Sequence, residues 1–161
     1  MKISILYHSK TGNTKEMADV IAQGILKEDV KVKTFSIDDI DEAWVKESSC
    51  VIVGTPIYMA TTSASIKVWL DTNASKLNLA GKIGGAFATA EYIHGGAEIG
   101  IQSILDHMLV FGMLVYSGGF ALGDPVIHLG PVGIAGKLDE SKETFELYGQ
   151  RMASKTKEIF K

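Results

Sequence analysis

Apolar residues recur along the chain in five runs of strand length. The runs extend over Ile3 to His8, Val30 to Ser36, Cys50 to Gly54, Gly84 to Thr89 and Met113 to Gly118. The first and third are nearly continuous in isoleucine, leucine and valine, which is typical of strands buried on both faces of a parallel sheet. We therefore expect each run to form one strand of such a sheet.

Helical spacing of apolar side chains fills the segments between these runs. Three such faces are Met17, Val20, Ile21 and Ile25; Ile66, Trp69, Leu70 and Asn73; and Ile101, Ile104, Leu105 and Met108. Asp38 to Glu47 predicts a short helix. We also predict a final helix from Asp139 to Phe160. One stripe along this helix holds Phe145, Tyr148, Met152 and Ile159. Strand and helix thus alternate five times, and right-handed crossovers make this a doubly wound, three-layer α/β fold, which we expect to be one domain over residues 1–161.

A hydroxyl-rich hexapeptide follows the first strand and precedes the first helix. It reads Ser9-Lys10-Thr11-Gly12-Asn13-Thr14. Three hydroxyls, a glycine that lets the backbone curl and the free N–H groups of a helix start together form an anion cradle. A plain helix cap needs only one hydroxyl, so the loop predicts a phosphate site.

Competing nucleotide motifs are missing from the sequence. No Gly-x-x-x-x-Gly-Lys-Ser/Thr occurs, and no Gly-x-Gly-x-x-Gly follows a strand, which argues against an ATPase and a self-contained dinucleotide fold. A phosphate-accepting signalling domain would need carboxylates after the first and third strands, where this chain has His8 and Gly54-Thr55.

The hexapeptide resembles the FMN-phosphate loop of flavodoxins, Ser/Thr-x-Thr-Gly-x-Thr, and matches it completely. The resemblance implies a flavodoxin-like fold whose five parallel strands lie in the order 2-1-3-4-5. It also implies one non-covalently bound FMN, with its phosphate on residues 9–14. In such a sheet the ligand binds outside the carboxyl ends of the strands, where the chain order reverses, and flavodoxin itself is an established example of this rule.

Two further loops leave carboxyl ends of strands beside this point. They are Thr55-Pro56-Ile57-Tyr58-Met59-Ala60 and Thr89-Ala90-Glu91-Tyr92-Ile93-His94-Gly95-Gly96. Tyr58, Met59 and Tyr92 would supply the apolar faces that an isoalloxazine ring needs, and backbone amides near Ala60 and Ala90 would meet its polar edge. We therefore predict that residues 55–60, residues 89–92 and Gly95 bind the cofactor together with residues 9–14.

The middle of the chain looks like the NAD(P)H:quinone reductases related to the tryptophan-repressor-binding protein. The segments that carry this resemblance are Pro56, Ile66-Lys67-Val68-Trp69-Leu70-Asp71, Leu79-Ala80-Gly81-Lys82 and His94-Gly95-Gly96-Ala97-Glu98. It implies NAD(P)H as electron donor and two-electron reduction of a quinone or another small acceptor. His94 is the predicted catalytic residue, since a histidine can deliver a proton to a reduced flavin or quinone. Those enzymes carry an arginine where this chain has Ile57-Tyr58, and they are longer by an insertion in the later half.

Two functions remain open from the sequence. The first is the enzyme just described, with a small-molecule donor and acceptor. The second is an electron carrier between protein partners, as flavodoxins are. Carriers of this kind are strongly acidic near the flavin, whereas the formal net charge here is only -3, which favours the enzyme. The long connection Gly119 to Leu138 would cover the flavin or bind a second copy of the chain in a homo-oligomer.

Composition excludes several other classes. The small negative net charge has the wrong sign for a general nucleic-acid or membrane-surface binder. No apolar stretch reaches the length of a membrane span, and Met1 to Ser9 is too short for a signal peptide, so we expect a cytoplasmic protein. Cys50 is the only cysteine, which leaves no internal disulfide and no cysteine-based metal site.

Overall fold

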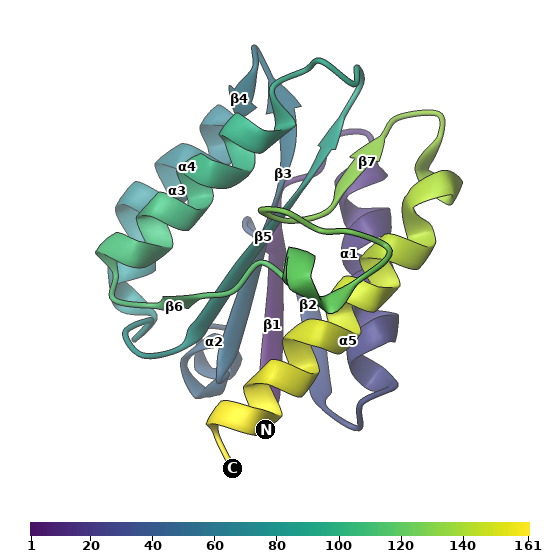
Figure 1. Cartoon of the computed structure of the whole chain (residues 1–161). Coiled ribbons are helices and arrows are strands. Elements are labelled where there is room, and N and C mark those ends of the chain that lie inside the picture. Colours follow the sequence, from purple (N-terminus) through teal and green to yellow (C-terminus); the bar gives the residue numbers. More distant parts are fainter.

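Seven strands form one sheet in the computed structural model, which describes residues 1–161 (Figure 1). Five follow the order β2-β1-β3-β5-β6, and all the pairs along this path are parallel. Their bounds are β1 Lys2–Tyr7, β2 Lys31–Ser36, β3 Cys50–Tyr58, β5 Ile83–Ala90 and β6 Leu114–Val115. Two short strands complete the sheet: β4, Thr61–Thr62, pairs antiparallel with β3, and β7, Val132–Ile134, pairs parallel with β5. The expected order 2-1-3-4-5 is confirmed, with seven strands instead of five.

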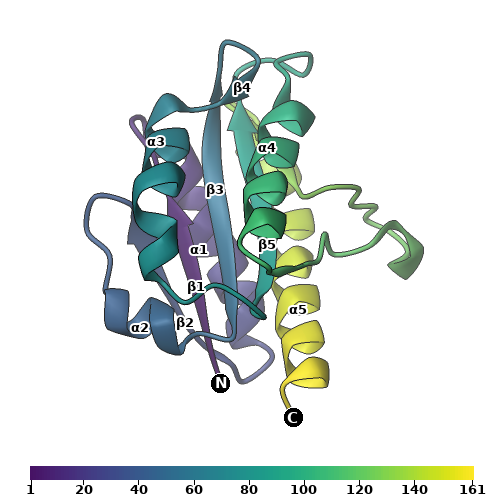
Figure 2. The same ribbon diagram turned by 90° about the vertical axis from the view of Figure 1, so that its left-hand side faces the viewer.

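Helices cover both faces of the sheet, as the alternating pattern predicts (Figure 2). The α-helices are α1 Asn13–Leu26, α2 Glu42–Glu47, α3 Ala64–Asn73, α4 Ala97–Val110 and α5 Lys142–Ile159. Short 3-10 turns are η1 Ala74–Lys76, η2 Phe120–Leu122 and η3 Leu138–Ser141. Helices α1 and α5 lie on one face, with α2, α3 and α4 on the other. None of the helices is both long and apolar enough to span a membrane.

The apolar core is divided in two by the sheet. On β3, Val51 and Val53 belong to the cluster beneath α2, α3 and α4, while Cys50 and Ile52 belong to the cluster beneath α1 and α5. Alternate side chains of a strand point to opposite faces, so a strand buried on both sides must be apolar throughout. This arrangement explains the continuous runs in the sequence.

A close helix crossing determines where α1 lies. A Cβ atom on Gly149 of α5 would lie 2.2 Å from the carbonyl oxygen of Ile21, and one on Gly24 of α1 would lie 2.0 Å from that of Glu146. The two glycines let the helix backbones meet directly. This contact holds the axis of α1, and with it the helix start that follows the predicted phosphate loop.

The expected fifth strand, Met113 to Gly118, is divided in two in the structure. Only Leu114 and Val115 pair with the amino-terminal end of β5. The chain returns at Val132 to pair with the carboxyl-terminal end of β5. Gly118 and Gly119 have φ of 86° and 72°, a backbone conformation that turns the chain out of the sheet at little cost for glycine. Residues 116–131, which we call the excursion, project from the edge of the sheet (Figure 2).

Several expected boundaries also differ from the structure. The third strand extends beyond Gly54 to Tyr58, because β4 folds back and pairs with its end. The helix expected from Asp38 begins only at Glu42, since the Asp41 side chain accepts a hydrogen bond from the Trp44 N–H and caps it. The final helix begins at Lys142, and Ile159 is 46% exposed, outside its buried stripe.

A single buried arginine holds the excursion against α5. Nη1 of Arg151 donates to the carbonyl oxygens of Gly118 and Gly119 at 3.0 and 3.3 Å. Its Nη2 donates to those of Leu122 and Gly123 at 3.2 and 3.1 Å. The guanidinium thus organises the turn around four backbone acceptors, and the excursion has a defined shape although it leaves the sheet.

Candidate functional site

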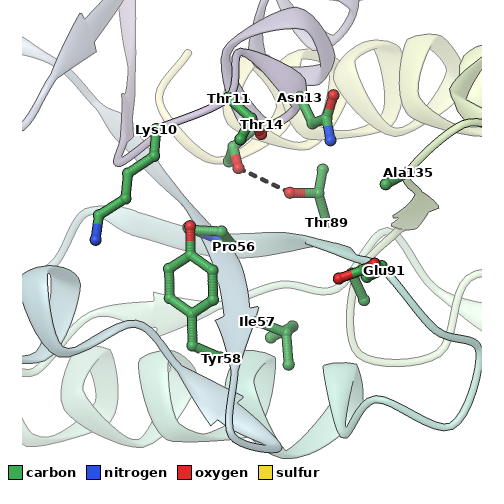
Figure 3. Close-up of a pocket in the computed structure, with 11 residues that line it drawn as sticks. Lys10, Thr11, Asn13, Thr14, Pro56, Ile57, Tyr58, Thr89, Glu91 and Ala135 are labelled. Atoms are coloured by element: carbon green, nitrogen blue, oxygen red, sulfur yellow. Dashed lines mark hydrogen bonds between the residues drawn. The ribbon is translucent and has the colours of Figure 1, made fainter.

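A cleft of about 450 Å³ opens at the carboxyl ends of β1, β3 and β5 (Figure 3). Its walls are Lys10, Thr11, Asn13, Thr14, Pro56, Ile57, Tyr58, Thr89, Ala90, Glu91 and Ala135. All three loops predicted from the sequence contribute to it. The volume lies within the range of sites for small molecules and cofactors.

The predicted phosphate loop forms one end of the cleft. Gly12 has φ of 95° and turns the chain into α1, which begins at Asn13 without a side-chain cap. The backbone N–H of Lys15 donates to Oγ of Ser9 at 3.3 Å, and that of Glu16 donates to the Gly12 carbonyl at 2.9 Å. The N–H groups ahead of them in the first turn have no acceptor within the helix. They and the positive end of the helix dipole are available to an anion.

Two threonine hydroxyls join the first and third loops. Oγ1 of Thr14 and Oγ1 of Thr89 lie 2.7 Å apart, and both residues are buried (Figure 3). A hydroxyl has one hydrogen, so the pair uses one hydrogen between its members and leaves the other for a ligand. This contact brings together residues that are 75 positions apart in the sequence.

The second loop is a β-hairpin rather than an open loop. Met59 and Ala60 form its two-residue turn, with φ of 50° and 61°, the conformation that hairpin turns of this length favour. The Thr55 hydroxyl accepts hydrogen bonds from the Thr62 hydroxyl at 2.9 Å and the Ser63 N–H at 3.0 Å. Thr55 is fully buried and ties the hairpin together instead of facing the cleft.

Contacts with the third loop fix the position of this hairpin. A Cβ atom on Gly96, at the start of α4, would lie 2.5 Å from the carbonyl oxygen of Ala60. Gly96 therefore allows the two loops to touch. Met59 is 97% exposed, and neither turn residue is part of the cleft wall.

Part of the third loop faces a second, adjoining cleft of about 410 Å³. Its walls are Glu91, Tyr92, Ile93, His94, Ile134, Lys137, Glu140 and Ser141. Glu91 lines both clefts. The structure thus places Tyr58 in one cleft and Tyr92 with His94 in the other, so the expected pair of tyrosines does not face one common space. Within the third loop, the N–H of Gly95 donates to the Tyr92 carbonyl at 2.9 Å, and this hydrogen bond closes the turn over residues 92–95.

The structure divides the predicted binding residues into two groups. Those in the first cleft are Lys10, Thr11, Asn13, Thr14, Pro56, Ile57, Tyr58, Thr89, Ala90 and Glu91. Those outside its wall are Ser9, Gly12, Thr55, Met59, Ala60, Tyr92 and Gly95. Ala135 lines the cleft and was missed, because it follows β7, the returning half of the divided fifth strand. No local feature of the sequence marks a two-part strand.

A buried histidine lies beneath the phosphate loop. Nδ1 of His8 is 3.2 Å from Oγ of Ser63, which also accepts a hydrogen bond from the Ile66 N–H and caps α3. Burial lowers the pKa of His8; nearby Asp38 raises it and Lys10 lowers it further. His8 therefore connects the phosphate loop with the segment that follows the hairpin.

Comparison with known proteins agrees with this architecture. Residues 4–90 match a family model described as a flavodoxin domain. The chain is 46% identical to a flavodoxin of Clostridium saccharobutylicum, over 99% of this chain and the whole of the relative. It is 27% identical to an NAD(P)H dehydrogenase (quinone) of Cupriavidus metallidurans, over 80% of this chain and 73% of that protein. Among solved structures, a flavodoxin from the domain Archaea superposes with a TM-score of 0.79 at 29% identity, covering 98% of this chain and 99% of the other.

Proposed function

The chain belongs to the flavodoxin family, and from this premise we propose that it binds one FMN and carries electrons between redox proteins. The observation that carries the proposal is the complete Ser9–Thr14 loop at the uncapped start of α1, which forms one end of the cleft. We favour the electron carrier over the quinone reductase that the sequence led us to expect. The flavodoxin relative is similar along its whole length, whereas the quinone dehydrogenases are more distant.

The residues present suit FMN in three respects. The hydroxyls of Thr11 and Thr14 and the first-turn N–H groups would hold the phosphate. Ile57 and Tyr58 offer an apolar and aromatic wall to a flat ring. A Cβ atom on Gly12 would meet no other atom within 4 Å, so the loop is open on the side where its backbone curves. When bound, FMN supplies reversible uptake of electrons, and these residues bind and orient it.

Charge beside the cleft favours a protein partner. Asp38 and Asp39 are exposed and follow β2 at its carboxyl end, the edge of the sheet where the cleft opens. Asp38 is near enough to His8, beneath the phosphate loop, to raise its pKa. Acidic groups at this edge would steer a partner with a basic surface toward the flavin, an effect that depends on ionic strength.

A second candidate is NAD(P)H-dependent reduction of a quinone or another small acceptor. The adjoining cleft favours it, because this space shares Glu91 with the first cleft and could receive a second small molecule. His94 lines this second cleft and would be the proton donor in such a reaction. The two candidates differ in their partners and agree in their cofactor.

Electron transfer from the FMN-loaded protein separates the two candidates. Chemically reduced holoprotein should pass electrons to a basic acceptor such as cytochrome c, faster at low salt than at high salt, while NADH and NADPH remain unoxidised. Free FMN at the same concentration is the control, because its reaction with the acceptor lacks steering by the protein. Sustained NAD(P)H oxidation with a quinone, together with slow transfer to the protein acceptor, would instead support the reductase.

A further inference from the structure

Lys10 supplies a cation in the wall of the proposed FMN cleft. Its Nζ atom lies 5.7 Å from the centroid of the Tyr58 ring, the distance of a cation–π contact. Two lysines at either end of α1 are paired with carboxylates: Lys15 with Asp19, and Lys27 with Glu146. The ammonium of Lys10 forms no ion pair, so its charge remains available to a ligand.

The side chain of Lys10 extends toward the aromatic part of the cleft. It leaves the phosphate loop on the side away from the hydroxyls of Thr11 and Thr14 and runs toward Tyr58 (Figure 3). Its backbone belongs to the phosphate-binding segment, yet its charge lies by the residue that would face the ring. The only acidic side chain in the same wall is Glu91, which comes from the third loop.

We infer that Lys10 raises the reduction potential of the bound flavin by holding positive charge beside its ring; this inference rests on the proposed function. Uptake of two electrons from a reductant and one proton from solvent leaves one negative charge on the isoalloxazine. A neighbouring cation stabilises that charge and has no comparable effect on the neutral oxidised ring. Lys10 is therefore a residue that tunes the cofactor, and it differs in role from the hydroxyls that hold the phosphate.

A different role for Lys10 would be that of a counter-ion to the phosphate. Riboflavin distinguishes the two roles, because it has the same ring as FMN and lacks the phosphate. A phosphate counter-ion strengthens the binding of FMN and not of riboflavin. A cation beside the ring acts on both flavins alike, and its main effect is on the equilibrium between oxidised and reduced forms.

The test compares Lys10→Met with Lys10→Arg, which keeps the charge, and with Lys27→Met. The last variant removes the same charge at the far end of α1. Dissociation constants for oxidised FMN and riboflavin come from fluorescence titration, and the two-electron potential from equilibration with a reference dye. For Lys10→Met we expect similar, small changes in both affinities. We also expect about a tenfold fall in the reduction equilibrium constant, or about 30 mV for two electrons.

Each other outcome has a defined meaning. Lys10→Arg and Lys27→Met should keep the wild-type potential. An unchanged potential in Lys10→Met, or tenfold weaker binding of FMN with riboflavin unaffected, would overturn the inference. If the wild-type protein bound neither FMN nor riboflavin, the proposed function would be overturned, and the inference with it.

Discussion

At the scale of single residues, the cleft depends on hydroxyl groups placed by three different elements. Thr11 comes from the loop before α1, Thr14 from the first turn of α1, and Thr89 from the end of β5. The bond between Thr14 and Thr89 keeps two of these hydroxyls at a distance of 2.7 Å in a buried position. Hydrogen bonds from such groups to a charged phosphate are stronger than those between neutral partners.

Replacing both Thr11 and Thr14 with valine should weaken FMN binding by several kcal/mol. Each lost hydroxyl removes a bond to a charged group, worth roughly 1.5–3 kcal/mol. A flavin-fluorescence titration measures the change, and circular dichroism confirms that the variant is folded. The double serine variant is the matched control, because it keeps both hydroxyls and should retain most of the affinity. Equal affinity of the valine variant and the wild type would show that the phosphate is bound elsewhere.

At the scale of elements, the excursion shows how one side chain can determine the shape of a segment outside the sheet. Arg151 is 9% exposed and has no carboxylate partner; its hydrogen bonds go to four carbonyl groups of residues 118–123. Phe120 and Leu122 are 65% and 57% exposed, so apolar packing contributes little to residues 118–123. The guanidinium therefore provides the main attachment of these residues, whereas Ile127, which is 2% exposed, anchors the later part of the excursion in the core.

Arg151→Met should release residues 118–123 and destabilise the protein by about 3 kcal/mol. The four carbonyl groups lose a charged donor, and several of them are only partly accessible to water. Urea unfolding measures the free energy, and hydrogen exchange of residues 118–123 reports local release. Glu143→Met, at an exposed position of the same helix, should change neither measurement by much. Undiminished protection of residues 118–123 in Arg151→Met would be inconsistent with this account.

At the scale of the whole molecule, stability is linked to pH through His8. Burial lowers the pKa of His8 below its ordinary value of 6.5, so the unfolded chain binds a proton at this residue more readily than the folded chain. Protonation then favours unfolding. This effect is absent above the ordinary pKa and grows as the pH falls through the range just below it.

The apoprotein should therefore lose stability as the pH falls below about 6.5, and His8→Asn should lose less over that interval. Asparagine cannot titrate, and it can keep a hydrogen bond to Ser63. Urea unfolding at closely spaced pH values gives the two curves. Carboxyl groups with lowered pKa values, such as Asp71, are common to both proteins and act at lower pH. Parallel curves would rule out His8 as the source.

Net charge and the local charge near the cleft point in different directions for this chain. A value of -3 averages the whole surface and favoured an enzyme over an acidic carrier. The structure places Asp38 and Asp39 at the edge of the sheet where the cleft opens. Steering depends on the local field near the site. The position of a few charges therefore matters more than their sum.

The sequence by itself determined the features that arise from short stretches of chain. Continuous apolar runs predicted buried parallel strands, and alternation with helical spacing predicted the three layers, because each pattern reports how a segment is buried. The predicted phosphate loop is also a local feature. Its hydroxyls, its glycine and the start of α1 all lie within residues 9–14, where local backbone geometry brings them together.

Only the tertiary structure decided which distant residues meet. The hydrogen bond of Thr14 with Thr89, the place of Ala135 in the cleft wall and the separation of Tyr58 from Tyr92 all depend on how whole elements pack. The divided fifth strand has the same cause, since strands of two and three residues are too short to show a period. A sequence pattern indicates that a residue is buried. Which distant residue it contacts depends on how the whole elements pack.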